Sequence, residues 1–178
     1  AQVRVFTQRS AWESAVGSTS VETFEKDSIT TSNTPYDSTR GWKFRSASAP
    51  FTLQILRNGL VDGSRGMHFR DFGNGMSVAF PASANQLAFG LDYRTGFEAW
   101  ELKIGGRLVA NLPRGTNGFV GVTVSSAVPD FVLTSPSSAQ GGLSIDNLGV
   151  RFRSRHAGLS HVALGQARLQ DRGDSLAV

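Results

Sequence analysis

The chain has 178 residues and a formal net charge of +4, from 18 Lys and Arg against 14 Asp and Glu. It contains no cysteine, which excludes disulfide bonds, zinc–thiolate sites and thiol nucleophiles. No apolar run reaches about 18 residues, so we predict no membrane span, and the mild basic excess favours an acidic partner but is too small to be typical of a nucleic-acid-binding protein.

The beginning of the chain predicts one strand and one short helix. An apolar stretch at 3–6 indicates the strand, and residues 7–17 place apolar side chains such as Trp12 at helical spacing. Ser10 is the predicted N-cap of this helix and Gly17 its end. The sequence starts at Ala1 without a Met or an apolar leader, as a mature chain does after signal-peptide removal, so we expect a secreted protein.

Short apolar runs separated by turn residues predict roughly ten further strands. They lie at 20–26, 42–46, 51–58, 67–72, 76–80, 85–94, 100–106, 107–112, 118–124, 129–135 and 141–152. The Gly-Asn-Gly sequence at 73–75 predicts a hairpin between two of these strands. No interval is long enough for a helical crossover between parallel strands.

These features predict an all-β domain at 1–153, built as a two-sheet antiparallel β-sandwich of the jelly-roll type with one short N-terminal helix. Trp42 and Trp100 each share a strand face with apolar neighbours, so we expect both in the core. Residues 154–178 are polar and weakly patterned. They are either a linker or tail of this domain or the start of a further module.

Asp146 lies inside the last apolar run, and a buried carboxylate needs a group that compensates its charge. Three interpretations remain open from the residues alone. A cation is bound there, or Asp146 pairs with an arginine such as Arg151 or Arg153 or with backbone amides at a bulge, or it belongs to an active site.

Four segments carry a resemblance to a known family: VFTQRSAWESAV with VETFE near the start, LAFGLDYR, GFVGV and GGLSIDNLGV. They resemble the secreted β-sandwich proteins common among bacterial exosortase-sorted (PEP-CTERM) proteins and are similar to jelly-roll carbohydrate-binding modules, over about residues 3–153. The resemblance implies a structural calcium ion held by Glu22 or Glu25 together with Asp146, with Asn147 or a nearby carbonyl as a further ligand. Calcium prefers carboxylate and carbonyl oxygens of this kind.

Carbohydrate binding needs aromatic faces for stacking and polar side chains around them. Tyr36, Tyr93 and Phe97 have turn-rich neighbours that place them at sheet ends, with Arg94 beside them. Arg151 and Arg153 alternate along the last strand and fit an acidic polysaccharide. The other interpretation of these two arginines is an edge strand protected by charge.

No motif for catalysis is found. The G-x-S-x-G sequence of serine hydrolases is missing. His68 has no partner residue at a spacing that indicates catalysis, so a surface role is the simpler interpretation. Asp92 occupies a position in which the resembled proteins often carry an aspartate, which suggests a structural role. Our leading hypothesis is a secreted, non-catalytic β-sandwich that binds a polysaccharide or cell-surface glycan. The alternatives are a polysaccharide-degrading hydrolase or lyase and a structural matrix or assembly protein.

Overall fold

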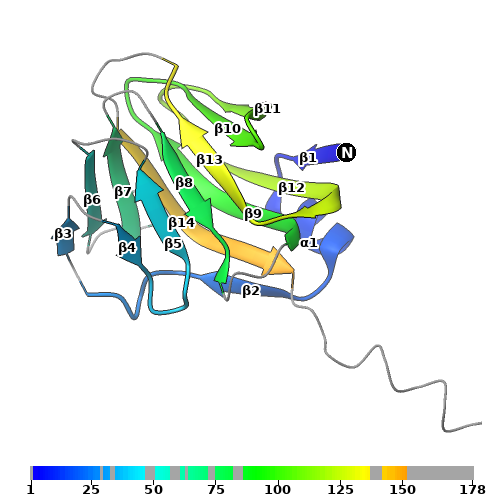
Figure 1. Ribbon diagram of the computed structural model, residues 1–178, viewed down its shortest axis with the longest axis horizontal. Helices are drawn as coiled ribbons and strands as arrows, with labels where there is room; N and C mark the ends of the chain where they lie inside the picture. Colours follow the sequence, from blue (N-terminus) through cyan, green and yellow to red (C-terminus); the bar gives the residue numbers. More distant parts are fainter. Residues whose placement is uncertain are drawn as a thin grey trace, which may run out of the picture.

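The computed structural model describes residues 2–28, 30–32, 35–46, 51–56, 61–62, 64–71, 75–81, 86–136 and 142–151. Arg153 and the segment 154–178 lie outside the described residues. Within them, two antiparallel β-sheets pack face to face, with one short helix against the larger sheet (Figure 1). No helix in the described part of the chain is long and apolar enough to cross a membrane.

The larger sheet runs in the order β1-β12-β9-β14-β7-β6-β3, and β2 pairs with β14 beside this path. Its strands are β1 (Val3–Phe6), β2 (Thr19–Glu22), β3 (Thr30–Ser32), β6 (Phe51–Leu56), β7 (Gly66–Asp71), β9 (Gln86–Thr95), β12 (Asn117–Val128) and β14 (Gly142–Arg151). The central strand β14 therefore joins the last described part of the chain to strands from its beginning and its middle.

The smaller sheet runs in the order β11-β10-β13-β8-β5-β4. Its strands are β4 (Tyr36–Asp37), β5 (Lys43–Ser46), β8 (Met76–Ala79), β10 (Trp100–Ile104), β11 (Arg107–Leu112) and β13 (Asp130–Thr134). From β7 to β10 the chain alternates between the two sheets (Figure 1). This crossing back and forth gives the antiparallel jelly-roll sandwich that the sequence predicts.

The prediction of a hairpin at 73–75 is wrong, because β7 and β8 belong to different sheets. β7 pairs with β6 and β14, whereas β8 pairs with β13 and β5. Both strands present fully buried side chains to the same core, Phe69 from one and Val78 from the other. An alternating pattern reports one buried face, and two such strands can face each other across a sandwich as readily as they pair edge to edge.

The inner faces of the two sheets meet in one apolar core. Trp42 and Trp100 are both buried there, as predicted. Phe89 of the larger sheet stacks on Phe131 of the smaller one with ring centroids 4.5 Å apart. Aromatic contacts of this kind join the two layers and fix which side chains of each strand point outward.

Helix α1 (Arg9–Val16) packs on the outer face of the larger sheet, where it contacts β12 and β9. Trp12 is fully buried, and a Cβ atom on Gly121 would lie 2.5 Å from its ring. Gly17 ends the helix at φ 79°, as predicted, but the N-cap is Gln8 and Ser10 lies inside the helix. The helix covers the outer face over β12 and β9.

Candidate functional site

A row of polar residues crosses the outer face of the larger sheet. The strand register places Gln54 opposite His68, His68 opposite Ser144, Ser144 opposite Arg94, and Arg94 opposite Asn117. Five neighbouring strands, from β6 to β12, each contribute one side chain. Because side chains directly opposite each other lie about 5 Å apart, the row forms a continuous polar surface.

A shallow hollow of about 310 Å³ lies along this row. His68, Arg70, Arg94, Phe97 and Ser144 line it, with the backbone of two glycines between them. Phe97 lies at the edge of the hollow, and its side chain is 95% exposed. Single exposed apolar side chains are common on folded proteins, but an aromatic ring beside polar side chains offers a flat surface for stacking. We call the hollow with these five side chains the outer groove.

His68 has a defined position in the outer groove. Its Nδ1 atom is hydrogen-bonded to Ser144 Oγ at 3.0 Å. A Cβ atom on Gly142 would lie only 2.4 Å from the imidazole ring, so the ring occupies the space that any other residue at 142 would fill. Burial, and then the positive charge of Arg70, lower the pKa of His68. The imidazole is therefore neutral at pH 7.

The turn that carries Phe97 is held by backbone hydrogen bonds. The N–H of Gly96 donates to the carbonyl of Gly142 at 3.2 Å, and the N–H of Gly115 donates to the carbonyl of Gly96 at 2.8 Å. The Thr95 hydroxyl also donates to the Pro113 carbonyl. These contacts fix the backbone on both sides of the exposed ring, so the ring is presented from an ordered base.

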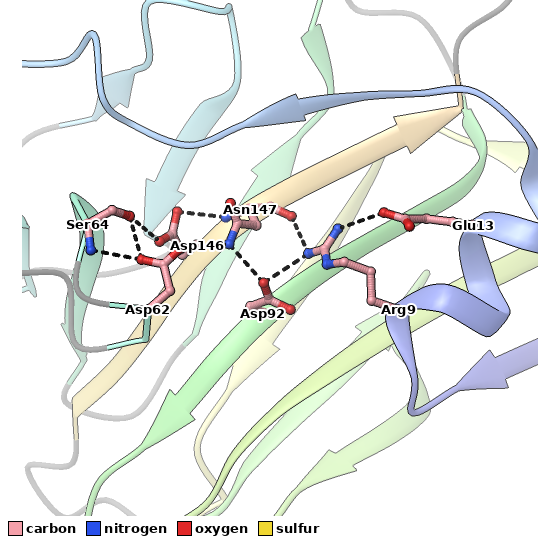
Figure 2. A network of polar contacts seen from close by, with 7 residues as sticks. All are labelled: Arg9, Glu13, Asp62, Ser64, Asp92, Asp146 and Asn147. Atoms are coloured by element: carbon pink, nitrogen blue, oxygen red, sulfur yellow. Dashed lines mark hydrogen bonds and ion pairs between the residues drawn. The ribbon is translucent and has the colours of Figure 1, made fainter.

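Asp146 lies in the next row of the same outer face, opposite Asp92 on β9. It is fully buried. The N–H of Asn147 donates to its Oδ1 at 2.7 Å, and the Ser64 hydroxyl donates to its Oδ2 at 3.3 Å (Figure 2). The carboxyl of Asp62 adjoins it, and the Ser64 hydroxyl also donates to Asp62.

These surroundings change the proton affinity of both carboxyls. Burial raises the pKa of Asp146 to about 7, and the charge and hydrogen bond of Asp62 add to this, against the Asn147 and Ser64 donors. The hydrogen bond from Ser64 is the main cause that lowers the pKa of Asp62. The raised pKa favours a proton on Asp146, shared with Asp62 through the hydrogen bond between the two carboxyls, and below about pH 7 this proton compensates the buried charge. No arginine is among the groups that the structure shows in contact with Asp146.

Asn147 connects this pair to helix α1. It adopts a positive φ of 48° at the irregularity in the β14–β9 pairing, a conformation that Asn tolerates well. Its side-chain amide donates to Asp62 at 3.2 Å and to Asp92 at 2.9 Å. Arg9 forms an ion pair with Asp92 at 3.1 Å and donates to the Asn147 carbonyl at 2.8 Å (Figure 2). Asp92 therefore has a structural role in the described fold.

Of the four residues that the resemblance implies as calcium ligands, the two glutamates have contacts separate from those of Asp146 and Asn147. Glu22 is buried and accepts hydrogen bonds from the Phe24 N–H and the Ser38 hydroxyl. Glu25 accepts one from the N–H of Arg65. Among the described residues, no three His, Cys, Asp or Glu form a group that could hold a metal ion. The Asp62–Asp146 pair suits a hard cation in chemistry but supplies fewer oxygens than the six to eight that calcium takes.

Of the five predicted ligand-binding residues that the structure describes, two lie in the outer groove and three lie elsewhere. Arg94 and Phe97 line the outer groove. Tyr93 was expected at a sheet end but lies within β9 with its ring in the core, 8% exposed, because the strand runs on to Thr95. Tyr36 is half-buried on β4 of the smaller sheet, where its ring packs on Phe44. Arg151 is exposed at the end of β14.

Sequence reasoning missed three of the groove residues, Arg70, Ser144 and Gly142. His68 was considered as a candidate for catalysis and interpreted as a surface residue. The signal that could have found them is polar residues at alternate positions of strands whose other positions are apolar, as in the run from Met67 to Arg70. That signal marks an outward-facing surface, but it does not show which strands are neighbours.

No protein-family model matches the sequence, and no curated protein matches it. Among solved structures, the chain resembles the K2 cleaved adhesin domain of Lys-gingipain, with a TM-score of 0.54 and 10% identity, over 75% of this chain and 98% of that one. The K1 cleaved adhesin domain of Lys-gingipain from Porphyromonas gingivalis W83 gives a TM-score of 0.52 and 10% identity, over 78% and 100%. The CBM22-1-GH10 modules of Clostridium thermocellum endo-1,4-β-D-xylanase 10B, complexed with xylohexaose, give 0.48 and 15%, over 76% and 28%. The likeness to the two adhesin domains shows the β-sandwich fold.

Proposed function

We propose that this protein is a secreted, non-catalytic β-sandwich that binds a polysaccharide or cell-surface glycan in the outer groove. The observation that carries the proposal is the Phe97 ring, 95% exposed at the edge of a hollow lined by His68, Arg70, Arg94 and Ser144. An aromatic face accepts the apolar face of a sugar ring, and the polar side chains beside it bind its hydroxyl groups.

The shape of the groove supports a polymer ligand. A second hollow of about 520 Å³ adjoins the first, and Arg94, Phe97 and Asn117 are among the residues that line it. The two hollows share Arg94 and Phe97. A chain of sugars passing over the Phe97 ring would contact both, whereas a single small ligand needs only one enclosed pocket.

Export and calcium binding belong to this proposal as expectations from the sequence. The resemblance to exosortase-sorted proteins supports export, and the absence of cysteine is compatible with it. A structural calcium ion is the alternative to the shared proton at the Asp62–Asp146 pair. Calcium would need the ionised form of Asp146, so pH and calcium compete at this position.

A polysaccharide-cleaving enzyme is the second candidate, favoured by the hydrogen bond between His68 and Ser144. A histidine held by a hydrogen bond can act as a general base. Hydrolysis of glycosidic bonds, however, commonly uses a pair of carboxylates. In the described part of the chain, the groups found to affect the pKa of His68 include Arg70 and no carboxylate, and so we place binding first.

The test is electrophoresis in gels that contain neutral or acidic polysaccharides, with assay of the same gels for released sugar. We expect retardation without released sugar, and loss of retardation in Phe97→Ala. Leu108→Ala is the matched control, because Leu108 is also exposed, at 51%, but lies on β11 of the smaller sheet. Cleavage would favour the enzyme. Assembly without retardation by any polymer would favour the structural protein.

A further inference from the structure

We propose that the outer groove binds an anionic sugar unit, a uronate or a sulfated sugar of an acidic polysaccharide, between Arg70 and Arg94. The inference rests on the proposed function above and names the class of glycan. The two arginines supply the charge, and Phe97 supplies the stacking surface.

The strand register brings the two arginines to the same place. Arg70 on β7 lies opposite Gly142, and Arg94 on β9 lies opposite Ser144, both on the strand β14 between them. Positions 142 and 144 are two apart and so point to the same side of the sheet. Strands two steps apart are separated by about 10 Å, and the two-residue offset adds about 7 Å along the strands, so the two Cα atoms lie roughly 12 Å apart on a diagonal. Two long arginine side chains can therefore reach one carboxylate or sulfate group above β14.

Between the two arginines, the imidazole of His68 forms the floor of the outer groove. Gly142 carries no side chain, so the ring can lie where a Cβ atom at position 142 would extend. The Ser144 hydroxyl is hydrogen-bonded to His68 Nδ1 at 3.0 Å. An anionic group entering here would meet guanidinium donors on two sides and the imidazole below.

The formal charge of the groove comes from its two arginines. His68 beside them is neutral at pH 7, and no acidic residue is among the described residues that line the groove. In the next row, Asp92 forms an ion pair with Arg9, and the raised pKa of Asp146 favours its uncharged form below about pH 7. A cleft lined by positively charged side chains attracts anions, and the planar guanidinium matches carboxylate and sulfate oxygens.

The test compares polymers that differ only in charge. Polygalacturonate and its carboxyl-reduced form give one pair, and a sulfated galactan and its desulfated form give another. The proteins are the wild type, Arg70→Gln, and Arg107→Gln as a control. Arg107 is exposed on β11 of the smaller sheet, so the control removes the same net charge from another surface. A single-stranded oligonucleotide is included as a non-saccharide polyanion.

The expected result is binding to the uronate or the sulfated polymer and not to its neutral counterpart. Arg70→Gln should weaken that binding by about tenfold or more, since hydrogen bonds to charged groups are strong, and Arg107→Gln should leave it within about twofold. Which acidic polymer binds tells a uronate from a sulfate. Equal binding to the neutral polymers overturns the anionic class and leaves the proposed function intact. Equal effects of the two variants, or tighter binding to the oligonucleotide, overturn the inference, and binding to no polysaccharide overturns the proposed function itself.

Discussion

The Nδ1 atom of His68 and the Oγ atom of Ser144 lie 3.0 Å apart, hydrogen-bonded between two neighbouring strands whose other side chains form the core. The residues are 76 positions apart in the sequence. Their contact fixes the imidazole over Gly142 and defines the floor of the outer groove. The properties of the groove therefore depend on a local geometry that single substitutions can change.

Gly142→Ala should weaken glycan binding, because the added Cβ atom would lie 2.4 Å from the His68 ring and displace it. We expect a loss of binding of about tenfold and, as for other overpacked sites, a loss of stability of about 1–3 kcal/mol. Gly149→Ala is the control, since its Cβ atom would lie 3.0 Å from the Trp12 ring, which also overpacks the outer face but away from the outer groove. Binding isotherms and thermal unfolding measure the two effects. Unchanged binding in Gly142→Ala would contradict the role of the His68 position.

The affinity for an acidic glycan should increase as the pH falls from 7 toward 5. His68 has a lowered pKa in the free protein, and a bound anion favours its protonated form, so proton uptake accompanies binding at low pH. The charged groups near it are Arg70 on its own strand and Arg94 on β9, while β6 and β14 present Gln54 and Ser144. The gain is about tenfold for each unit by which binding raises the pKa of His68.

His68→Gln separates this effect from other titrations. The variant keeps a polar side chain of similar reach, and its affinity should not change between pH 7 and 5. Titration calorimetry in two buffers of different ionisation enthalpy measures the protons taken up by each protein. A pH dependence that survives in His68→Gln would assign the effect to another group.

Asp146 should make the protein less stable as the pH rises. Its pKa is about 7 in the fold and 3.8 as its ordinary value, so the folded protein holds this proton more tightly than the unfolded chain does. The free energy of unfolding therefore decreases between pH 4 and 7 on account of this group and is steady above. Asp146→Asn, which stays neutral, should lack this decrease and be more stable than the wild type at pH 8 without calcium.

Calcium reverses that prediction if it binds at Asp146. Each kcal/mol moves the unfolding temperature of a domain of this size by roughly 2–4 °C. With calcium at pH 8, the wild type would gain stability through bound ion and Asp146→Asn would not. Thermal unfolding with calcium and with a chelator distinguishes the two states. No effect of calcium on either protein would leave the shared proton as the group that compensates Asp146.

The ion pair between Arg9 and Asp92 should couple helix α1 to the sheet. The pair is 3.1 Å long and about three-quarters buried on both sides, with 25% and 21% of the side chains exposed. In a double-mutant cycle with Arg9→Met and Asp92→Asn, we expect a coupling energy of about 1 kcal/mol. The Arg9 guanidinium also lies over the Phe119 ring, 4.6 Å from its centroid, and the loss of this contact in Arg9→Met cancels in the cycle because it occurs with or without Asp92→Asn. Additive effects in urea unfolding would show that the pair contributes no net stability.

Much of the fold follows from the sequence because local patterns determine it. The strand at Val3–Phe6, the end of the helix at Gly17 and the buried Trp100 all depend on neighbours within a few residues. The pairing of strands does not. The hairpin at 73–75 was wrong because the same alternation suits a strand that pairs and a strand that crosses to the other sheet.

The site was predictable only where a loop marks it. Phe97 has turn-rich neighbours, so the sequence placed it at a sheet end with Arg94 beside it, and both residues line the outer groove. Ser144 and Arg70 lie inside strands and become groove residues only through the order β7-β14-β9. Tyr93 was placed wrongly because one step along a strand exchanges the core for the surface.

The most direct test of the central claim is an NMR titration of isotope-labelled protein with oligosaccharides of the polymer that retards it in gels. The account predicts that chemical shifts change at the backbone amides of His68, Phe97 and Ser144 and at the guanidinium signals of Arg70 and Arg94. Changes centred on the smaller sheet, around Arg107 or Tyr36, would contradict it.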